Sequence, residues 1–146
     1  MTKLDIGTGL YEKEDFLRLL GEDIERAKAE ERCYSVLAVV AQHLPGENVR
    51  DIVEVAAGCL QDLMRDNDLV GRLDDDVLAL GLRDTDSVEA GVVSFRLQGD
   101  LRLKSFHLRN TVWEPGVASL GDNGETTEEL LKAAIEAAKN RRRRLG

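Results

Sequence analysis

The chain has 146 residues, 42% of them hydrophobic and 33% charged, a composition typical of one soluble globular domain with its own core. Its formal net charge of −8 disfavours a role in non-specific nucleic-acid binding. Because no apolar run is long enough to span a bilayer and no signal peptide opens the sequence, we expect a cytoplasmic protein without membrane insertion.

The first part of the chain alternates helical and extended patterns. Apolar residues recur at helical spacing over residues 13–32, and a branched apolar run over residues 34–41 predicts a buried strand. A second helical pattern follows over residues 47–66. Cys33 and Cys59 fall in these apolar stretches, so we expect two buried free thiols.

Residues 65–82 predict a helix end, a short strand, a tight acidic turn and a second, buried strand. Three consecutive aspartates form the turn, and aspartate tolerates turn geometry better than most residues do. We therefore expect a β-hairpin in the middle of the chain.

The second part of the chain predicts further helices and strands. A turn at residues 84–87 caps a helix whose apolar residues Val88, Val92 and Phe95 we expect to lie in the core. Residues 101–108 alternate as LRLKSFHL, which predicts an edge strand, and residues 111–120 predict another strand. A capping box at residues 126–129 begins the last helix. The order of elements indicates one α/β domain, residues 1–146, with helices around a mixed sheet.

The hairpin region also carries a pair of motifs. Arg65-Asp66-Asn67-Asp68 is followed, after five residues, by Asp74-Asp75-Asp76-Val77-Leu78. This spacing resembles the R-x-x-D and GG(D/E)EF motifs of the GGDEF family of diguanylate cyclases. The DIGTGL sequence at residues 5–10 and residues 116–119 are similar to two further family segments. The resemblance covers nearly the whole chain and implies a nucleotidyl-cyclase-like fold with a central sheet flanked by helices.

The resemblance implies chemistry on GTP and Mg²⁺, and Asp76 keeps the third signature position, but other residues for that chemistry are replaced. Val40 lies at the strand end where the family has a metal carboxylate, and Val77 replaces the acid that follows Asp76. Asp74 and Asp75 stand in place of the two glycines that allow phosphates to approach the backbone. We therefore expect a degenerate signature, with no catalytic residues, no metal site, no cofactor and no cyclase activity.

In the family, the R-x-x-D motif is the inhibitory site that binds cyclic di-GMP. An arginine can donate two hydrogen bonds to guanine or pair with a phosphate, and an aspartate can accept from the guanine N–H donors. Arg65 and Asp68 fit these roles, and Arg96 corresponds to the second arginine of the family's site. The resemblance implies a cyclic di-GMP site formed by these three residues, and a homodimer that the ligand bridges.

The R-x-x-D pattern also has a plainer interpretation, because the pairs Arg72/Asp75 and Arg83/Asp86 share it. Such pairs are commonly surface salt bridges of little energetic worth, and we expect Arg65, Asp68 and these other arginines to lie at the surface. Our prediction is a non-catalytic cyclic di-GMP effector with a protein partner in a signalling pathway. The alternatives are a ligand-free protein–protein interaction module of the same fold and, third, a residual cyclase.

Overall fold

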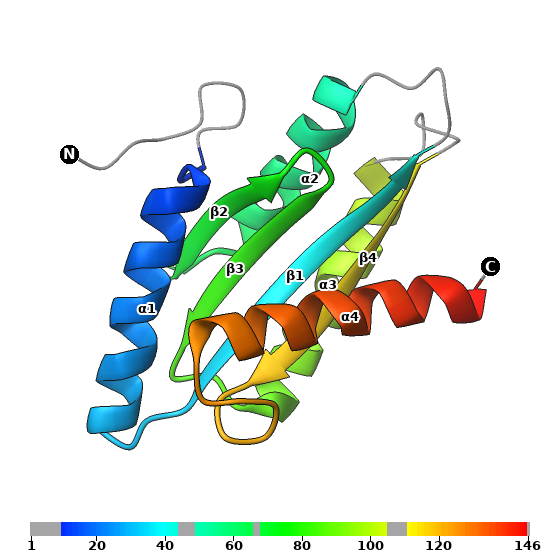
Figure 1. Ribbon diagram of the computed structural model, residues 1–146. Helices are drawn as coiled ribbons and strands as arrows, with labels where there is room; N and C mark the ends of the chain where they lie inside the picture. Colours follow the sequence, from blue (N-terminus) through cyan, green and yellow to red (C-terminus); the bar gives the residue numbers. More distant parts are fainter. Residues whose placement is uncertain (1–9, 44–48, 66–67, 105–110, 146) are drawn as a thin grey trace.

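The computed structural model describes residues 10–43, 49–65, 68–104 and 111–145 of the chain, which form a sheet with helices on both faces (Figure 1). The elements in chain order are α1 (Lys13–Ala29), β1 (Tyr34–His43), α2 (Val49–Leu63), β2 (Leu69–Asp74), β3 (Val77–Arg83), α3 (Ser87–Lys104), β4 (Thr111–Ser119) and α4 (Thr127–Leu145). The family-like segment at residues 5–10 lies outside the described residues except for Leu10. None of the described helices has the length and apolar character that crossing a membrane requires.

The four strands lie in the order β2-β3-β1-β4, and every neighbouring pair is antiparallel. The predicted α/β fold is confirmed, and so is the hairpin, which β2 and β3 form. The parallel pairing expected of a mixed sheet is limited, among the described residues, to two isolated bridges, Tyr11 with Gly71 and Leu120 with Gly124.

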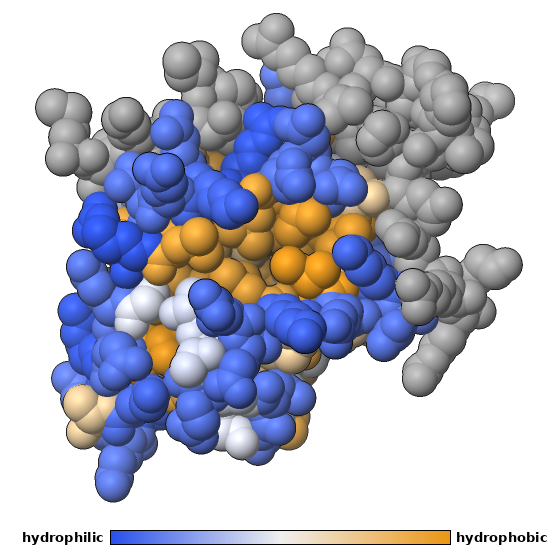
Figure 2. Space-filling view, viewed as in Figure 1, coloured by the Kyte–Doolittle hydropathy of each residue, from blue (hydrophilic) through white to orange (hydrophobic). Residues whose placement is uncertain are grey.

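Alternate side chains of the central strand point to opposite faces of the sheet, as the twofold period of a strand requires. Leu37 and Val39 join the cluster that α2 and α3 cover, whereas Val36 and Ala38 join the cluster under α1 and α4. Figure 2 shows apolar side chains gathered between α1 and α4 on the face turned to the viewer, with a hydrophilic border around them.

Both predicted helix starts are confirmed. Asp86 accepts a hydrogen bond from the backbone N–H of Glu89 at 2.8 Å and so caps α3. At the start of α4, the Thr126 hydroxyl accepts from the Glu129 N–H at 3.2 Å and donates to the Glu129 carboxylate at 3.2 Å. Local side-chain chemistry therefore fixes where these two helices begin.

The edge strand predicted over residues 101–108 is wrong as far as the structure describes it, because residues 101–104 form the last turn of α3. Leu97 and Leu101 are four residues apart and both buried, so they continue the helical packing face, and this outweighs the alternating pattern. Residues 105–108 lie outside the described residues. Among the residues that the structure describes, a single strand, β4, therefore follows α3 where we predicted two.

Two predictions about burial are also wrong. Val88, Val92 and Phe95 belong to α3 but point to solvent, because the helix packs through the other side, with the buried residues Ala90, Ser94, Leu97, Gln98 and Leu101. Cys33 is exposed at the entry to β1, where only the residues after it run into the sheet. Cys59 is buried, as predicted.

Candidate ligand-binding site

The R-x-x-D residues lie in the turn that connects α2 to β2. Asp68 donates its backbone N–H to the carbonyl oxygen of Arg65 at 3.0 Å, which closes the turn just before β2 begins. The Asp68 carboxylate in turn accepts three hydrogen bonds from Arg65, from the backbone N–H at 3.0 Å, Nε at 3.1 Å and Nη2 at 3.2 Å. The two residues thus form one closed unit of side chain and backbone.

Arg65 also ties this turn to the connection between β3 and α3. Its Nη2 donates to the carbonyl oxygen of Arg83 and to the Thr85 hydroxyl, both at 2.8 Å. The same hydroxyl donates to the Arg83 carbonyl at 2.8 Å. The hydrogen bonds to Asp68 raise the pKa of Arg65 further above its ordinary value, so the guanidinium carries a permanent charge.

Burial differs sharply between the two partners. The side chain of Arg65 is 56% exposed, whereas that of Asp68 is 1% exposed. Our expectation of surface positions therefore holds for Arg65 and is wrong for Asp68, whose buried carboxylate accepts hydrogen bonds from the backbone and side chain of Arg65. Of this pair, the charge that solvent can reach belongs to the arginine.

Arg96 is exposed on α3, and the described contacts include none between it and Arg65 or Asp68. It follows Glu89 by seven residues, which is two helical turns, so the two lie on one side of α3 about 10 Å apart along its axis. The Glu89 carboxylate is close enough to contribute to the raised pKa of Arg65. Arg96 therefore lies on the same side of α3 as Glu89, two turns further along the helix.

The other two R-x-x-D patterns have different outcomes. Arg72 forms a salt bridge with Asp75 at 3.0 Å, and that aspartate is 81% exposed. Arg83 instead bonds Asp23 of α1, with Nη2 to Oδ1 at 2.6 Å and Nε to Oδ2 at 3.1 Å. Of the three R-x-x-D patterns, the first thus forms an ion pair with a buried aspartate and the second an exposed ion pair at the hairpin turn. In the third, Arg83 pairs with Asp23 and not with Asp86.

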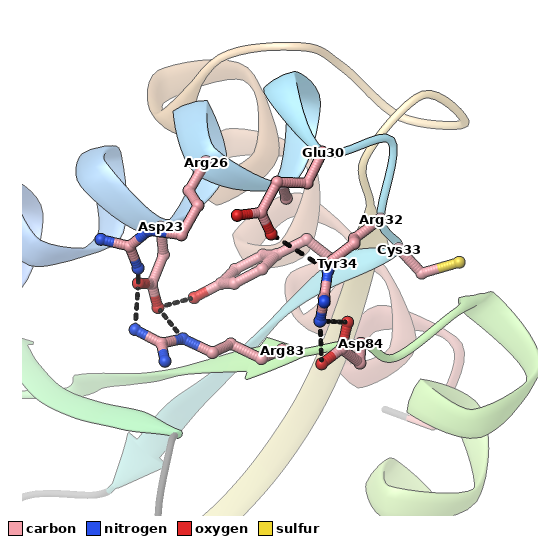
Figure 3. Close-up of a pocket in the computed structure, with 9 residues that line it drawn as sticks. Asp23, Arg26, Glu30, Arg32, Cys33, Tyr34, Arg83 and Asp84 are labelled. Atoms are coloured by element: carbon pink, nitrogen blue, oxygen red, sulfur yellow. Dashed lines mark hydrogen bonds and ion pairs between the residues drawn. The ribbon is translucent and has the colours of Figure 1, made fainter.

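Asp23 is the centre of a polar network that our reading of the sequence missed (Figure 3). Its carboxylate is buried and accepts hydrogen bonds from Arg83, from the Tyr34 hydroxyl at 3.0 Å and from Arg26 at 3.3 Å. Burial, followed by the charge of Asp23, raises the pKa of Tyr34 well above its ordinary value. The position of Asp23 beside Ile24 in the apolar stripe of α1 was the signal for a buried charge with partners.

A small cavity of about 150 Å³ opens beside this network and is lined in part by Arg26, Arg32 and Cys33 (Figure 3). The arginines that line it are paired: Arg32, for example, bonds both carboxylate oxygens of Asp84, at 3.2 and 3.3 Å. The arrangement is therefore that of a structural ion-pair network.

The signature positions lie at the opposite end of β2 from the R-x-x-D turn, about 20 Å away for a strand of this length. Asp74 ends β2, and its carboxylate accepts the backbone N–H of Asp75 at 2.8 Å. Asp75 and Asp76 form the turn, and the Asp76 carbonyl oxygen accepts from Ala41 at 2.9 Å.

Beyond the turn, Val77 begins β3 and Leu78 is fully buried. Val77 is the register partner of Val40 in β1, so the two valines lie side by side in the sheet. Within the described ranges, no three His, Cys, Asp or Glu side chains gather as a group able to hold a metal ion.

The fold and sequence were compared with those of known proteins. The FimX GGDEF domain from Pseudomonas aeruginosa superposes with a TM-score of 0.84 at 17% identity, covering 99% of this chain and 96% of that one. The GGDEF domain of DgcB from Caulobacter crescentus, solved in complex with c-di-GMP, gives a TM-score of 0.80 at 14% identity, with 96% and 87% covered. The diguanylate cyclase SiaD from Pseudomonas aeruginosa, solved with its activator SiaC, gives 0.82 at 21% identity, with 96% and 58% covered.

No curated protein matches the chain. The family model for the diguanylate cyclase GGDEF domain matches residues 2–145, almost the full length of the sequence. The chain therefore belongs to the GGDEF family.

Proposed function

We propose that this chain is a non-catalytic GGDEF domain that acts as a receptor for cyclic di-GMP. The observation that carries the proposal is the state of Arg65, whose guanidinium is fixed by the buried Asp68 while its side chain remains 56% exposed. A rigidly held and exposed guanidinium loses little conformational entropy when it binds a guanine edge or a phosphate.

The three site residues take different roles in this proposal. Arg65 supplies the charge-assisted contact to the ligand, and Arg96 adds a second cation from α3. Asp68 acts as a positioning residue for Arg65, because both of its carboxylate oxygens already accept from that side chain. A direct contact between Asp68 and guanine would require the pair to open.

The class of ligand is taken from the family. The related GGDEF domain of DgcB was solved in complex with c-di-GMP, which supports a dinucleotide as the ligand to test first. A planar guanidinium suits such a ligand, because it can bond guanine O6 and N7 in a bidentate manner or stack on the base.

The proposed loss of catalysis rests on the two paired valines. Val40 and Val77 are register partners in the sheet, and Val40 is 2% exposed. Both stand at positions where the family resemblance implies metal carboxylates. Hydrocarbon side chains cannot coordinate Mg²⁺. Asp74 and Asp75 are exposed and would add negative charge where a triphosphate must approach.

Isothermal titration calorimetry with cyclic di-GMP tests the receptor function. We expect the wild type to bind, Arg65→Ala to lose roughly 30- to 1000-fold in affinity, and Arg72→Ala, the matched R-x-x-D control, to bind as the wild type does. Arg65→Lys keeps the charge but not the planar fork, so we expect intermediate affinity. Circular dichroism of each variant establishes that the affinities are compared on folded protein.

An assay of purified protein with GTP and Mg²⁺ tests the second half of the proposal. We expect no cyclic di-GMP above background. Robust turnover by the pure protein would contradict the non-catalytic assignment without affecting the binding result.

A ligand-free interaction module is the second candidate function. It is favoured by the hydrogen bonds between Arg65 and Asp68, which already pair with each other without a ligand. Absence of any heat of binding for the wild type at millimolar cyclic di-GMP would support this module over the receptor.

A further inference from the structure

The outer side of α3 carries a continuous apolar stripe. Val88 is 75% exposed, Val92 56%, Phe95 75% and Leu103 79%. The spacing of these residues places them on one side of the helix, opposite the buried Ala90, Ser94, Leu97, Gln98 and Leu101. A helix that is apolar on two opposite sides has one side that its own fold does not cover, which is the mark of an interaction surface.

Gly99 lies within this stripe, four residues before Leu103. A Cβ at Gly99 would meet nothing within 4 Å, so the fold of the single chain does not require a glycine there. Glycine is among the poorest helix formers, but its lack of a side chain lets a second backbone approach closely. A second helix packed on this side of α3 would therefore explain why position 99 is a glycine.

We infer that the outer face of α3 is a self-association surface, on which a second copy of the chain packs its own α3 in antiparallel orientation. The stripe is complementary to itself about a twofold axis near Phe95. An axis there places Val88 opposite Leu103 of the second copy, and Val92 opposite Gly99. The branched side chain thus meets the residue without one, while the two Phe95 rings meet near the axis.

The charges on α3 favour the same arrangement. The helix begins with the acidic residues Asp86 and Glu89 and ends with the basic residues Arg102 and Lys104, of which Lys104 already pairs with Asp62 of α2 at 2.6 Å. Antiparallel packing brings the acidic end of one helix beside the basic end of the other and also opposes the helix dipoles. A parallel pair would place like charges together.

Residues 86–104 carry no net formal charge, although the whole chain carries −8. Between residues 86 and 104 the acidic side chains (Asp86, Glu89, Asp100) equal the basic ones (Arg96, Arg102, Lys104) in number. Two copies can therefore meet through α3 without strong repulsion. A single pair of helices gives a small interface, below roughly 1,200 Å², so we expect a weak dimer with a dissociation constant in the micromolar to millimolar range.

Sedimentation velocity on the whole chain, without ligand, from about 10 µM to 1 mM tests this inference over the range expected of a small interface. We expect the wild type to shift from monomer towards dimer and Phe95→Asp to remain monomeric. Phe95 is 75% exposed, so its replacement leaves the core intact, and circular dichroism checks this. Gln61→Glu adds the same charge on the exposed side of α2 and should associate as the wild type does. A monomeric wild type at every concentration, or a dimer that Phe95→Asp does not weaken, would overturn the proposal.

Cysteine cross-linking tests the orientation in a Cys33→Ser background, which removes the exposed native thiol. A mixture of Val92→Cys and Gly99→Cys proteins should form disulfide-linked dimers under mild oxidation, and Val92→Cys alone should not. Efficient cross-linking of Val92→Cys with itself would refute the antiparallel arrangement. Because no ligand is present, these results are independent of the cyclic di-GMP proposal, whose bridged dimer would depend on Arg65.

Discussion

Removing either member of the Arg65–Asp68 pair should destabilise the fold, but by unequal amounts. Arg65→Ala leaves a carboxylate whose side chain is 1% exposed and whose remaining described donor is one backbone N–H. Breaking a buried ion pair in this way should lower the free energy of unfolding by about 3 kcal/mol. This is the low end of the usual range, because Arg65 is more than half exposed and its charge is screened by solvent. Asp68→Ala instead leaves a guanidinium that water reaches and that keeps its bonds to Arg83 and Thr85, at a cost of about 1–2 kcal/mol.

The double variant sharpens this comparison. Once Asp68 is absent, losing Arg65 no longer strands a buried charge, so the double variant should be about as stable as Asp68→Ala. The resulting coupling free energy should then equal in magnitude the cost of Arg65→Ala alone, about 3 kcal/mol. Arg72→Ala removes the exposed R-x-x-D pair and serves as the control, with a cost below about 1 kcal/mol.

Urea denaturation followed by the fluorescence of Trp113, the single and buried tryptophan, measures these differences directly. For a chain of this size, 3 kcal/mol corresponds to a fall in Tm of about 6–12 °C. If Arg65→Ala is no less stable than Asp68→Ala, the carboxylate is not desolvated in solution and the reasoning fails.

Three further predictions concern the core and the thiols. Burial and Asp23 raise the pKa of Tyr34, so above about pH 10 only the unfolded state loses this proton. The free energy of unfolding should therefore be unaffected below that pH and fall above it by up to about 1.4 kcal/mol per pH unit. In denaturant titrations between about pH 9 and 11, Tyr34→Phe should reduce this fall. Gly116→Ala should lower the free energy of unfolding by about 3 kcal/mol or more, because a Cβ there would clash with the backbone of Ala134 and Ala138 in α4. Gly58→Ala, whose Cβ would meet nothing within 4 Å, should cause no loss. Equal stability of the two variants in urea denaturation would contradict the close packing of α4. In the native protein, the exposed Cys33 should react rapidly with a thiol reagent. The buried Cys59 should react only slowly, because burial also raises its pKa. A fast phase that remains in Cys33→Ser would show that Cys59 is accessible.

The sequence predicted the elements whose signals are local. The acidic turn between two apolar runs gave the hairpin, and Asp86 and Thr126 marked the helix starts, because these choices depend on neighbours within a few residues. At residues 101–104 a local alternation competed with the burial of Leu97 and Leu101, and the tertiary packing prevailed.

The same limit applies to the site. The spacing of Arg65 and Asp68 predicted their contact. It did not predict the burial of the carboxylate or the hydrogen bonds of Arg65 to Arg83 and Thr85, which lie some twenty residues away. In α3, the spacing of Val88, Val92 and Phe95 located one apolar side, but the opposite side is the one that the fold buries. The role of Asp23 depended on Arg83, sixty residues later.

The strand order has a consequence for how the chain folds. The hairpin of β2 and β3 joins neighbours in sequence, whereas β1 must find β3 across tens of residues and β4 across as many as eighty-four, from Ser35 to Ser119. Loop-closure entropy delays such distant pairings, so we expect the β1–β4 half of the sheet to form after the hairpin. Ala118, fully buried in β4, is a probe of this order: Ala118→Gly should speed unfolding and leave the folding rate almost unchanged. The edge strand that completes the sheet is then also the point from which the sheet comes apart.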